Sequence, residues 1–421
     1  MDSALGVGRQ PGTGIKPDYG RHRRAGLWRR GGRSVSVLVA AALVGGAAGP
    51  IGLAPGHGLR AGHGGAAGRG LTAYVTSPSL SNTGWVTPIN TMTNRPGKPI
   101  KVGDSPLAVA ITPGGKTAYV ANSGSGTVIP IVTATNTPGK PIKTGNSPGW
   151  IAITPNGKTA YVANQGPGIG RQGGTVTPIN TAANTPGKPI KAGISPGWIA
   201  ITPNGKTAYV ADIGSDTVTP IATATNRPGK PIKVGPNPSM IAVTPDGKTI
   251  YVANSGAFQP TPANTVTPIN TATNTPGKPI KVGTDPLAIA ITPDGKTLYV
   301  ANALSNTVTP IATATNTPGK PIKAGTFPWR IAITPNGKTA YIASNDSGTV
   351  TPIATATNTP GKPIKVGEMP RWIAITPDGK TAYVANWQSG TVTPIATATN
   401  KPGAPIKLGR FLTPTDIAFA S

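Results

Sequence analysis

The sequence predicts an all-β fold, a single β-propeller of eight four-stranded blades of about 42 residues, with the ring closed three-plus-one by the C-terminal strand. Three observations support this fold class. A unit of short β-branched runs repeats along the chain, its period is that of a propeller blade, and the two ends of the repeat region are incomplete in complementary ways.

One copy of the unit contains four runs rich in β-branched and apolar residues, at residues 289–292, 297–301, 307–313 and 321–324. Such runs are typical of β-strands, which we name A, B, C and D. The segment Thr292-Pro293-Asp294-Gly295 predicts a tight turn between strands A and B, because Pro presets φ and Gly accepts a positive φ. Residues 302–306 and 316–319 are predicted to be the next two turns. The unit is therefore an antiparallel meander, which cannot bury both its faces alone.

A tyrosine in strand B marks the period, with spacings of 45, 42, 48, 42, 48, 42 and 42 residues. The eight copies are Tyr74, Tyr119, Tyr161, Tyr209, Tyr251, Tyr299, Tyr341 and Tyr383. Four strands in roughly 40 to 45 residues is the size of a propeller blade.

The ends of the repeat region predict a closed ring. The first copy, from Leu71, has strands B, C and D but no strand A, whereas the chain ends in a lone strand A at residues 415–420. Pairing these two parts completes an eighth blade, and closure leaves only short outer edges.

The region before the repeats has the features of an export signal. Residues 1–20 are predicted to be a disordered lead, and residues 21–55 a signal peptide or N-terminal anchor, because six arginines precede an apolar run at residues 35–48. Residues 51–54 extend that run toward the roughly 20 residues of a membrane span, so an uncleaved anchor is the alternative. A Gly-rich linker at residues 56–70 then leads to the propeller at residues 71–421. We therefore expect a secreted protein or one at the extracellular cell surface, with membrane contact only through an uncleaved N-terminal segment.

The propeller is strongly basic and contains no cysteine. From residue 71 on, 23 Lys and 6 Arg face 10 acidic residues, a net charge of +19. Most of the excess repeats, because a lysine follows the A-B turn and Pro-Gly-Lys-Pro-Ile-Lys places two lysines on most D strands. Lys and Pro on an outermost strand protect its edge from pairing, and the same lysines offer a surface for nonspecific polyanion binding. The lack of cysteine excludes disulfides, thiolate metal sites and a lipid-bearing cysteine.

The chemistry of many enzymes is missing from the propeller. The histidines, His22, His57 and His63, all precede it, which excludes a His base, a Ser-His-Asp triad and a His-ligated metal from the domain. The sequence predicts no catalytic residue, no metal site and no cofactor. An oxygen-ligated Ca²⁺ remains an alternative, with acids near the D-A junctions as ligands: Asp104, Asp285, Glu368 and Asp416.

The positions at which the near-identical blades diverge are the candidate ligand site. The pair that follows the proline of strand A varies in size and charge, and the B-C loop varies too, being lengthened at residues 166–174 and 257–264 and carrying Trp85 and Trp387 elsewhere. The candidate ligand-binding residues are Trp150, Trp198, Met240, Trp329, Arg330, Arg371, Trp372 and Asp416. The D-A and B-C connections share one face of a propeller, so we expect these side chains to ring the mouth of the central channel. Arg with Trp binds carbonyl, phosphate or sugar groups; the alternative is that Trp fills gaps between blades.

The strand-B motif Tyr-Val-Ala-Asn at Tyr119, Tyr161, Tyr251 and Tyr383, each preceded by T-P-[DNG]-G-K-T, resembles the YVTN-type β-propeller repeat family. The resemblance covers essentially all of residues 71–421 and implies a lactonase-like or surface-layer-like propeller, often exported. Copies at Tyr74, Tyr209 and Tyr341 depart from the motif near its end. Such a family includes both enzymes and surface proteins, so the fold alone does not assign an activity.

The sequence favours an exported noncatalytic propeller that acts as a binding or surface-interaction module, with its ligand face at the D-A and B-C loops. An anionic wall polymer, a glycan and a small ligand are the candidate partners. A lactonase-like or lyase-like propeller enzyme is one alternative, although that class usually needs histidine or clustered carboxylates. A structural cell-wall or surface-layer protein is the other, because the blades are nearly identical.

Overall fold

In a computed structural model of the protein, residues 70–78, 83–167, 174–256, 263–409 and 412–421 are described. These residues form 40 strand segments. No helix that could cross a membrane occurs among them. The predicted lead, the signal or anchor segment and the linker up to residue 69 lie outside the described residues, as do residues 168–173 and 257–262 of the two lengthened B-C loops.

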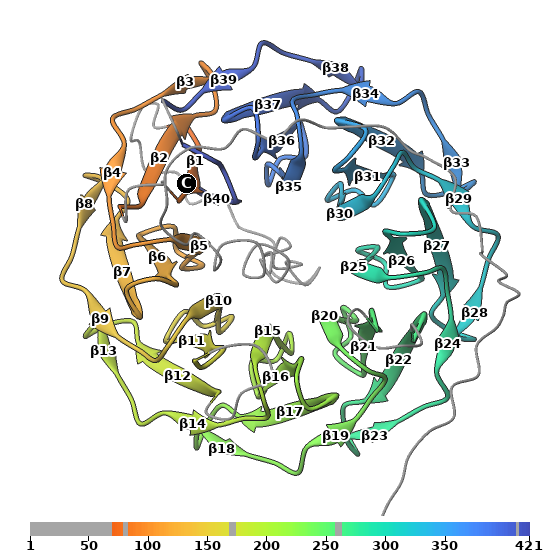
Figure 1. The fold of residues 1–421 in the computed structure, drawn as a ribbon, viewed down its shortest axis with the longest axis horizontal. Coiled ribbons are helices and arrows are strands. Elements are labelled where there is room, and N and C mark those ends of the chain that lie inside the picture. Colours follow the sequence, from red (N-terminus) through yellow and green to blue (C-terminus); the bar gives the residue numbers. More distant parts are fainter. Residues whose placement is uncertain (1–69, 79–82, 168–173, 257–262, 410–411) are drawn as a thin grey trace, which may run out of the picture. The chain divides into compact units, whose positions relative to one another are not determined.

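The strands form eight antiparallel sheets around a central axis (Figure 1). We number these blades 1 to 8 along the chain. The inner strands A are β40 (Asp416–Ala420) in blade 1, then β5 (Pro106–Ile111), β10 (Pro148–Ile153), β15 (Pro196–Ile201), β20 (Pro238–Val243), β25 (Pro286–Ile291), β30 (Pro328–Ile333) and β35 (Pro370–Ile375). The strands B are β1 (Thr72–Ser77), β6 (Thr117–Asn122), β11 (Thr159–Asn164), β16 (Thr207–Asp212), β21 (Thr249–Asn254), β26 (Thr297–Asn302), β31 (Thr339–Ser344) and β36 (Thr381–Asn386).

The outer half of each blade holds strand C and a strand D that is split into two short segments. The strands C are β2 (Trp85–Asn90), β7 (Thr127–Val132), β12 (Thr175–Asn180), β17 (Thr217–Ala222), β22 (Thr265–Asn270), β27 (Thr307–Ala312), β32 (Thr349–Ala354) and β37 (Thr391–Ala396). The segments of strand D are β3 (Arg95–Pro96) and β4 (Ile100–Lys101), β8 (Thr137–Pro138) and β9 (Ile142–Lys143), β13 (Thr185–Pro186) and β14 (Ile190–Lys191), β18 (Arg227–Pro228) and β19 (Ile232–Lys233), β23 (Thr275–Pro276) and β24 (Ile280–Lys281), β28 (Thr317–Pro318) and β29 (Ile322–Lys323), β33 (Thr359–Pro360) and β34 (Ile364–Lys365), and β38 (Lys401–Pro402) and β39 (Ile406–Lys407).

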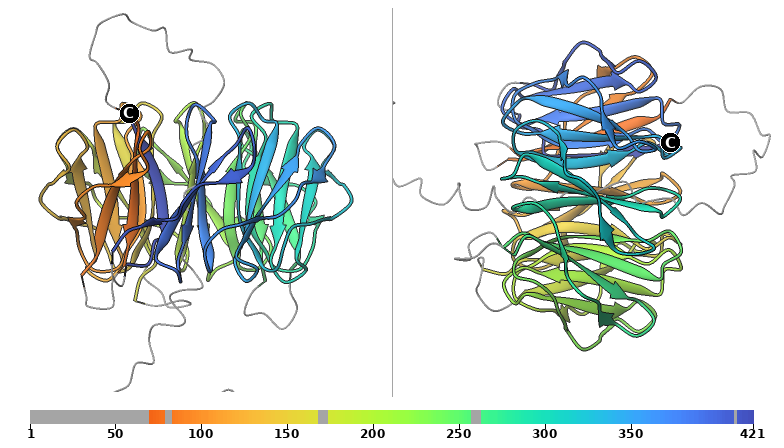
Figure 2. Two further views of the ribbon diagram at one scale, coloured as in Figure 1. Left: turned by 90° about the horizontal axis from the view of Figure 1, so that it is seen from above. Right: turned by 90° about the vertical axis from the view of Figure 1, so that its right-hand side faces the viewer.

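The sheets close into a ring, and Figure 2 shows them from the side, standing next to one another around the axis. Each inner strand contacts the inner strands of both neighbouring blades, and β40 contacts β35 on one side and β5 on the other. Strand β40 pairs antiparallel with β1, with Tyr74 opposite Ala418. Blade 1 is therefore built from both ends of the repeat region. The predicted eight-bladed propeller with three-plus-one closure is confirmed.

The predicted position of the C-D turn was wrong. Strand C ends at Ala312, the turn is at residues 313–316, and strand D starts at once with β28. Strand D then breaks beside Pro310 in the middle of β27, where the N–H of Gly319 donates to the Pro310 carbonyl at 2.7 Å. The N and O atoms of one strand residue point to the same neighbouring strand, so the missing N–H of Pro310 faces strand D and interrupts the ladder.

Tyrosines of strand B tie each blade to the next. Every one is at most 1 % exposed, and its phenol oxygen lies 3.1–3.3 Å from a threonine carbonyl oxygen and 2.5–2.7 Å from an asparagine Oδ1 in the C-D turn of the following blade. The pairs are Tyr74–Asn136, Tyr119–Asn184, Tyr161–Asn226, Tyr209–Asn274, Tyr251–Asn316, Tyr299–Asn358, Tyr341–Asn400 and Tyr383–Asn94. The last pair joins blade 8 to blade 1. Burial raises the pKa of Tyr299 to about 12, so this phenol keeps its proton at neutral pH.

Candidate functional site

Strand A has a β-bulge at its start, which explains why two successive positions vary between blades. In blade 8, Pro370 pairs with Asn386 and Trp372 with Ala385, so Arg371 between them is an extra residue. The same register shift occurs in each of the other complete blades. A bulge bends the strand and changes the direction of its side chains. The side chains at the first and second positions after the proline, such as Arg371 and Trp372, therefore point toward different parts of the protein.

The D-A and B-C connections lie together, as the sequence predicts. In blade 8 the N–H of Trp387, the first residue after strand B, donates to the carbonyl of Met369 before strand A at 2.9 Å. The equivalent bond in blade 7 joins Asn345 to Phe327, also at 2.9 Å. Residues that open strand A and residues that follow strand B thus share one face of the ring.

The second position after each proline forms a layer that fills the central channel. Trp150 of blade 3 stacks on Trp198 at a centroid distance of 4.0 Å and lies 6.4 Å from Trp372 of blade 8, which is not a neighbouring blade. This channel layer consists of Ala108, Trp150, Trp198, Met240, Ala288, Arg330, Trp372 and Asp416, none more than 7 % exposed. Six of the predicted ligand residues are therefore packed inside the channel, below its mouth.

Three side chains of the channel layer also bond to the next inner strand. The indole Nε1–H of Trp150 donates to the Ile199 carbonyl at 3.1 Å, and that of Trp198 donates to the Ile241 carbonyl at 3.0 Å. The Sδ atom of Met240 accepts the N–H of Ile289 at 3.3 Å. These bonds fix the rings and link blades 3 to 6 around the channel.

Arg330 and Asp416 are the charged members of the channel layer. Oδ2 of Asp416 accepts the N–H of Val109 at 2.8 Å, and Oδ1 accepts the N–H of Ile417, the next residue, also at 2.8 Å. Burial raises the pKa of Asp416 to about 7, opposed by these bonds and by Arg330. Burial likewise lowers the pKa of Arg330 to about 9, opposed by Asp416, while Arg371 adds to the lowering. The two buried charges stabilise each other.

Blades 7 and 8 bring arginine and aromatic side chains together at the mouth of the channel. The Arg371 guanidinium lies 4.1 Å from the centroid of Trp387, and Phe327 stacks on Trp329 at 5.7 Å. Beneath them, the guanidinium of Arg330 lies 5.4 Å from Trp372 and 5.6 Å from Trp329. We call these six residues the Arg–Trp cluster: Phe327, Trp329, Arg330, Arg371, Trp372 and Trp387. Arg371, Trp387 and Phe327 are half-buried and so reach the solvent.

The backbone of these two blades is strained just before strand A. Phe327 has a φ of 57° and Met369 a φ of 51°. Positive φ is uncommon for bulky residues, and the other complete blades place Ser, Asn or Asp there: Ser105, Ser147, Ser195, Asn237 and Asp285. Phe327 was not among the candidate residues, and Trp387 was noted only as part of a varying loop. Phe327 and Trp387 could have been singled out from the sequence, because they differ from the residue types at the same positions of the other blades.

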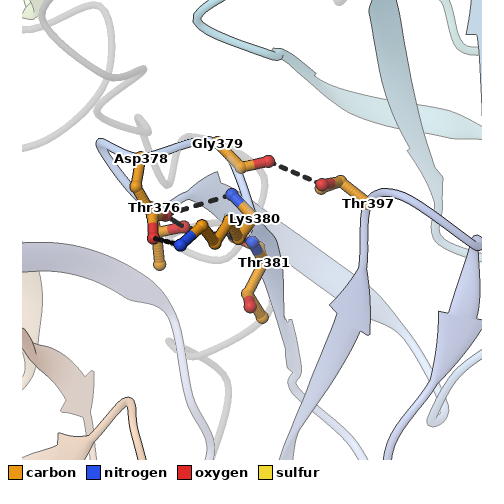
Figure 3. Close-up of polar contacts among 6 residues, drawn as sticks. All are labelled: Thr376, Asp378, Gly379, Lys380, Thr381 and Thr397. Carbon is orange, nitrogen blue, oxygen red and sulfur yellow. Dashed lines mark hydrogen bonds and ion pairs between the residues drawn. The ribbon is translucent and has the colours of Figure 1, made fainter.

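Carboxylates on the opposite face are occupied by turn formation (Figure 3). Oδ1 of Asp378 accepts the hydroxyl of Thr376 at 2.6 Å and the N–H of Lys380 at 3.0 Å, and these bonds lower its pKa, with Thr376 the larger cause. The hydroxyl of Thr397 donates to the Gly379 carbonyl at 2.6 Å, which fastens strand C to the turn. Asp246 and Asp294 form the same pattern. The tight turn predicted at Asp294 is confirmed.

The lysines of strand D are exposed. Within the described parts of the chain, Lys233–Asp216 at 3.9 Å and Lys380–Asp378 at 3.8 Å are the salt bridges. No group of three or more histidine, cysteine, aspartate or glutamate side chains in those parts could hold a metal ion. The Ca²⁺ alternative therefore finds no site among the residues that the structure describes.

Comparisons with known proteins agree with the fold. Residues 198–362 match the family model described as Lactonase, 7-bladed beta-propeller, although this chain has eight blades. Comparison with curated proteins gives no match. The predicted resemblance to a lactonase-like propeller repeat family is confirmed.

Three solved structures illustrate the likeness, and at these identities they show the fold alone. A Bacteroides fragilis protein assigned as a 6-phosphogluconolactonase is 20% identical, with a TM-score of 0.57 over 85% of this chain and 100% of that chain. Hydrazine synthase of Kuenenia stuttgartiensis is 24% identical, with a TM-score of 0.57 over 70% and 96%. The dihydro-heme d1 dehydrogenase NirN is 14% identical, with a TM-score of 0.69 over 89% and 80%.

Proposed function

We propose that this propeller, which is similar to lactonase-like repeat proteins, is an exported noncatalytic binding or surface-interaction module with its ligand face at the D-A and B-C loops. One observation carries the proposal: Arg371 stacks on Trp387 at 4.1 Å at that face, and both side chains are half-buried. A stacked guanidinium keeps its in-plane N–H donors available to a ligand. The aromatic surface beside it suits the apolar face of a sugar or another ring.

The packed channel layer supports this arrangement from below. Trp150, Trp198 and Met240 are bonded to neighbouring inner strands and buried, so we assign them to the rigid floor of the site. A ligand then first contacts the members of the Arg–Trp cluster that reach the solvent. A rigid floor that fixes the side chains above it lowers the entropy lost on binding.

The noncatalytic part of the proposal is supported by the residue types of the propeller. Residues 71–421 contain no histidine and no cysteine. Asp416, the carboxylate that acts on Arg330, is fully buried, and both its oxygens accept backbone N–H groups. A general base needs to reach the proton that it abstracts.

Tryptophan fluorescence of the purified protein tests the proposal. An anionic wall polymer and neutral glycans are titrated at low and at high salt, with the Trp387→Ala variant as the comparison. We expect a fluorescence change with one of these ligand classes that survives high salt and is lost in the variant. Binding that salt abolishes, with silent tryptophans, would reduce the interaction to nonspecific attraction by the lysines and overturn the proposal, as would no binding at all.

A lactonase-like enzyme is the second candidate, and the family match over residues 198–362 favours it because that segment includes Trp329 and Arg330. The test is turnover of 6-phosphogluconolactone and of unphosphorylated lactones by the purified protein. Turnover above the spontaneous rate that Arg371→Gln removes would place the enzyme first. Hydrolysis at the spontaneous rate alone would eliminate this candidate for these substrates.

A further inference from the structure

Trp372 differs from the other tryptophans of the channel layer in its indole N–H. Trp150 and Trp198 each donate to the carbonyl of the next inner strand. Nε1 of Trp372 is buried and has no hydrogen-bond partner among the described residues, although this side chain is only 1 % exposed. A buried donor without an acceptor costs about 1–3 kcal/mol. This N–H therefore gains from any acceptor that can reach it.

A second unsatisfied donor belongs to the preceding residue. Nε of Arg371 is also buried without a hydrogen-bond partner in the described part of the chain. Arg371 and Trp372 lie in the β-bulge at the start of β35, so the same irregularity of the strand sets the directions of both side chains. Arg371 reaches the solvent with part of its side chain, whereas Trp372 lies in the channel layer beneath.

Buried charged groups pack beneath these donors. Arg330 and Arg371 lie close enough that Arg371 lowers the pKa of Arg330. Asp416 is the carboxylate that acts on Arg330, and its two oxygens already accept backbone N–H groups. Burial also lowers the pKa of Arg371, so an anion that reaches this guanidinium would stabilise its charged form.

We infer that the Arg–Trp cluster binds the carboxylate of a small organic acid, with Arg371 and the N–H of Trp372 as donors and Trp387 and Trp329 as the aromatic walls. This inference rests on the proposed function and names the ligand class of the same face. A single carboxylate supplies one negative charge and two acceptor oxygens, which matches the guanidinium of Arg371 and the two unsatisfied donors. Hydrogen bonds to charged groups are the stronger ones, so the charge dominates recognition.

Calorimetric titration with two matched ligands tests the inference in the full-length protein. Benzoate carries the carboxylate on an aromatic ring, and benzamide has the same shape without the charge. We expect benzoate to bind at least about tenfold more tightly than benzamide. Inorganic phosphate is the third probe, and we expect it to bind more weakly than benzoate because it has no ring to stack.

Two substitutions separate the site from general effects. Trp372→Phe keeps the ring and removes the N–H, and we expect it to weaken benzoate binding about fivefold to tenfold. The control is Tyr251→Phe, which removes a hydroxyl that is bonded within the protein at a C-D turn, away from the Arg–Trp cluster; we expect it to leave the affinity unchanged. Arg371→Gln should abolish binding and Arg371→Lys should restore only part of it, because lysine keeps the charge and loses the planar donors. Thermal unfolding shows that each variant is folded.

Equal affinity for benzoate and benzamide would overturn the inference, and so would equal effects of Trp372→Phe and Tyr251→Phe. Phosphate binding that matches benzoate would show a general anion site instead of a carboxylate site and would also overturn it. If glycan or wall polymer still binds through Trp387 while benzoate does not, the carboxylate inference fails and the proposed function stands. If none of these ligands binds, both fail.

Discussion

The phenol oxygen of Tyr209 lies 2.7 Å from Oδ1 of Asn274 in the next blade and 3.3 Å from the carbonyl oxygen of Thr271. A phenol has one proton, so it can donate to only one of these two acceptors. Rotating the Asn274 amide presents its NH₂ group, and the phenol then accepts from the amide and donates to the carbonyl. Asn274 has a φ of 56°, which asparagine tolerates better than most residues. One side chain thus shapes the turn and joins two blades.

Tyr209→Phe should lower the free energy of unfolding by about 1–2 kcal/mol, because the Thr271 carbonyl and the Asn274 amide each lose a buried partner. Chemical denaturation measures the loss. Asn274→Gly removes the same contact and keeps the positive φ without strain, so it should resemble Tyr209→Phe. Asn274→Ala should cost about 1 kcal/mol more than Asn274→Gly; equal costs would contradict a role of asparagine in shaping the turn.

Deleting residues 415–421 should destabilise the propeller by about 3–5 kcal/mol, because β1 loses its inner partner and Arg330 loses the carboxylate that stabilises its buried charge. Thermal unfolding is the measurement. Deleting Ser421 alone is the control, since this residue is exposed and lies beyond β40. An unchanged melting temperature after the longer deletion would mean that the closing strand contributes nothing to stability.

Asp212 should make the propeller less stable as the pH rises. It replaces the asparagine that ends strand B in most blades, and burial raises its pKa to about 7 from the ordinary value of 3.8, opposed by hydrogen bonds from Thr219, Thr217 and Gly193. The folded state therefore holds this proton more tightly than the unfolded state, so the stability is full below about pH 4 and falls until about pH 7. One pKa unit is about 1.4 kcal/mol, so the whole fall in the free energy of unfolding is roughly 4 kcal/mol.

Asp212→Asn should remove that fall in stability. The free energy of unfolding of the variant, measured by denaturation, should therefore rise relative to that of the wild type between pH 4 and pH 8. Asp378→Asn is the control with the opposite sign. Its pKa is lowered by the Thr376 and Lys380 bonds, so the Asp378 charge stabilises the fold above about pH 4 and the variant should lose stability there. The Asp212 prediction is wrong if the difference between Asp212→Asn and wild type does not change with pH.

Met369→Asn should stabilise the protein by about 0.5–1 kcal/mol, because Met369 has a φ of 51° where other blades place Ser, Asn or Asp. The melting temperature measures the gain. Glu368→Asn is the control, since Glu368 is an exposed neighbour, and its φ is not among the positive ones. A gain from both variants would point to a general effect of asparagine and not to relief of strain.

The number of blades and the closure were predictable because local patterns determine them. The spacing of the strand-B tyrosines gives the repeat, and the lone strand before Ser421 has only β1 left to pair with. The split of strand D was also available in the sequence, since Pro310 stands in the middle of strand C and lacks the N–H that a continuous ladder needs.

Contacts across the channel could not be predicted in this way. That Trp150 meets Trp372 depends on the radius at which eight inner strands converge and on the small volumes of Ala108 and Ala288 in the same layer. The stacking of Arg371 on Trp387 depends on the bulge, which directs an extra residue toward the B-C loop. Neither quantity follows from the spacing of residues along one strand.

The Tyr383–Asn94 contact at the junction of blades 8 and 1 is the same as the contact at the other boundaries between blades. The junction that closes the ring therefore has the same Tyr–Asn contact as every other junction. The contacts between blades do not depend on which blade comes first in the sequence. A circularly permuted chain, with residue 421 linked to residue 71 between strands A and B of blade 1 and new ends opened at one C-D turn, keeps all but one of these Tyr–Asn contacts. The fold is thus defined by a rotation that maps each blade onto the next, and the ends of the chain are only one of several equivalent places to cut it.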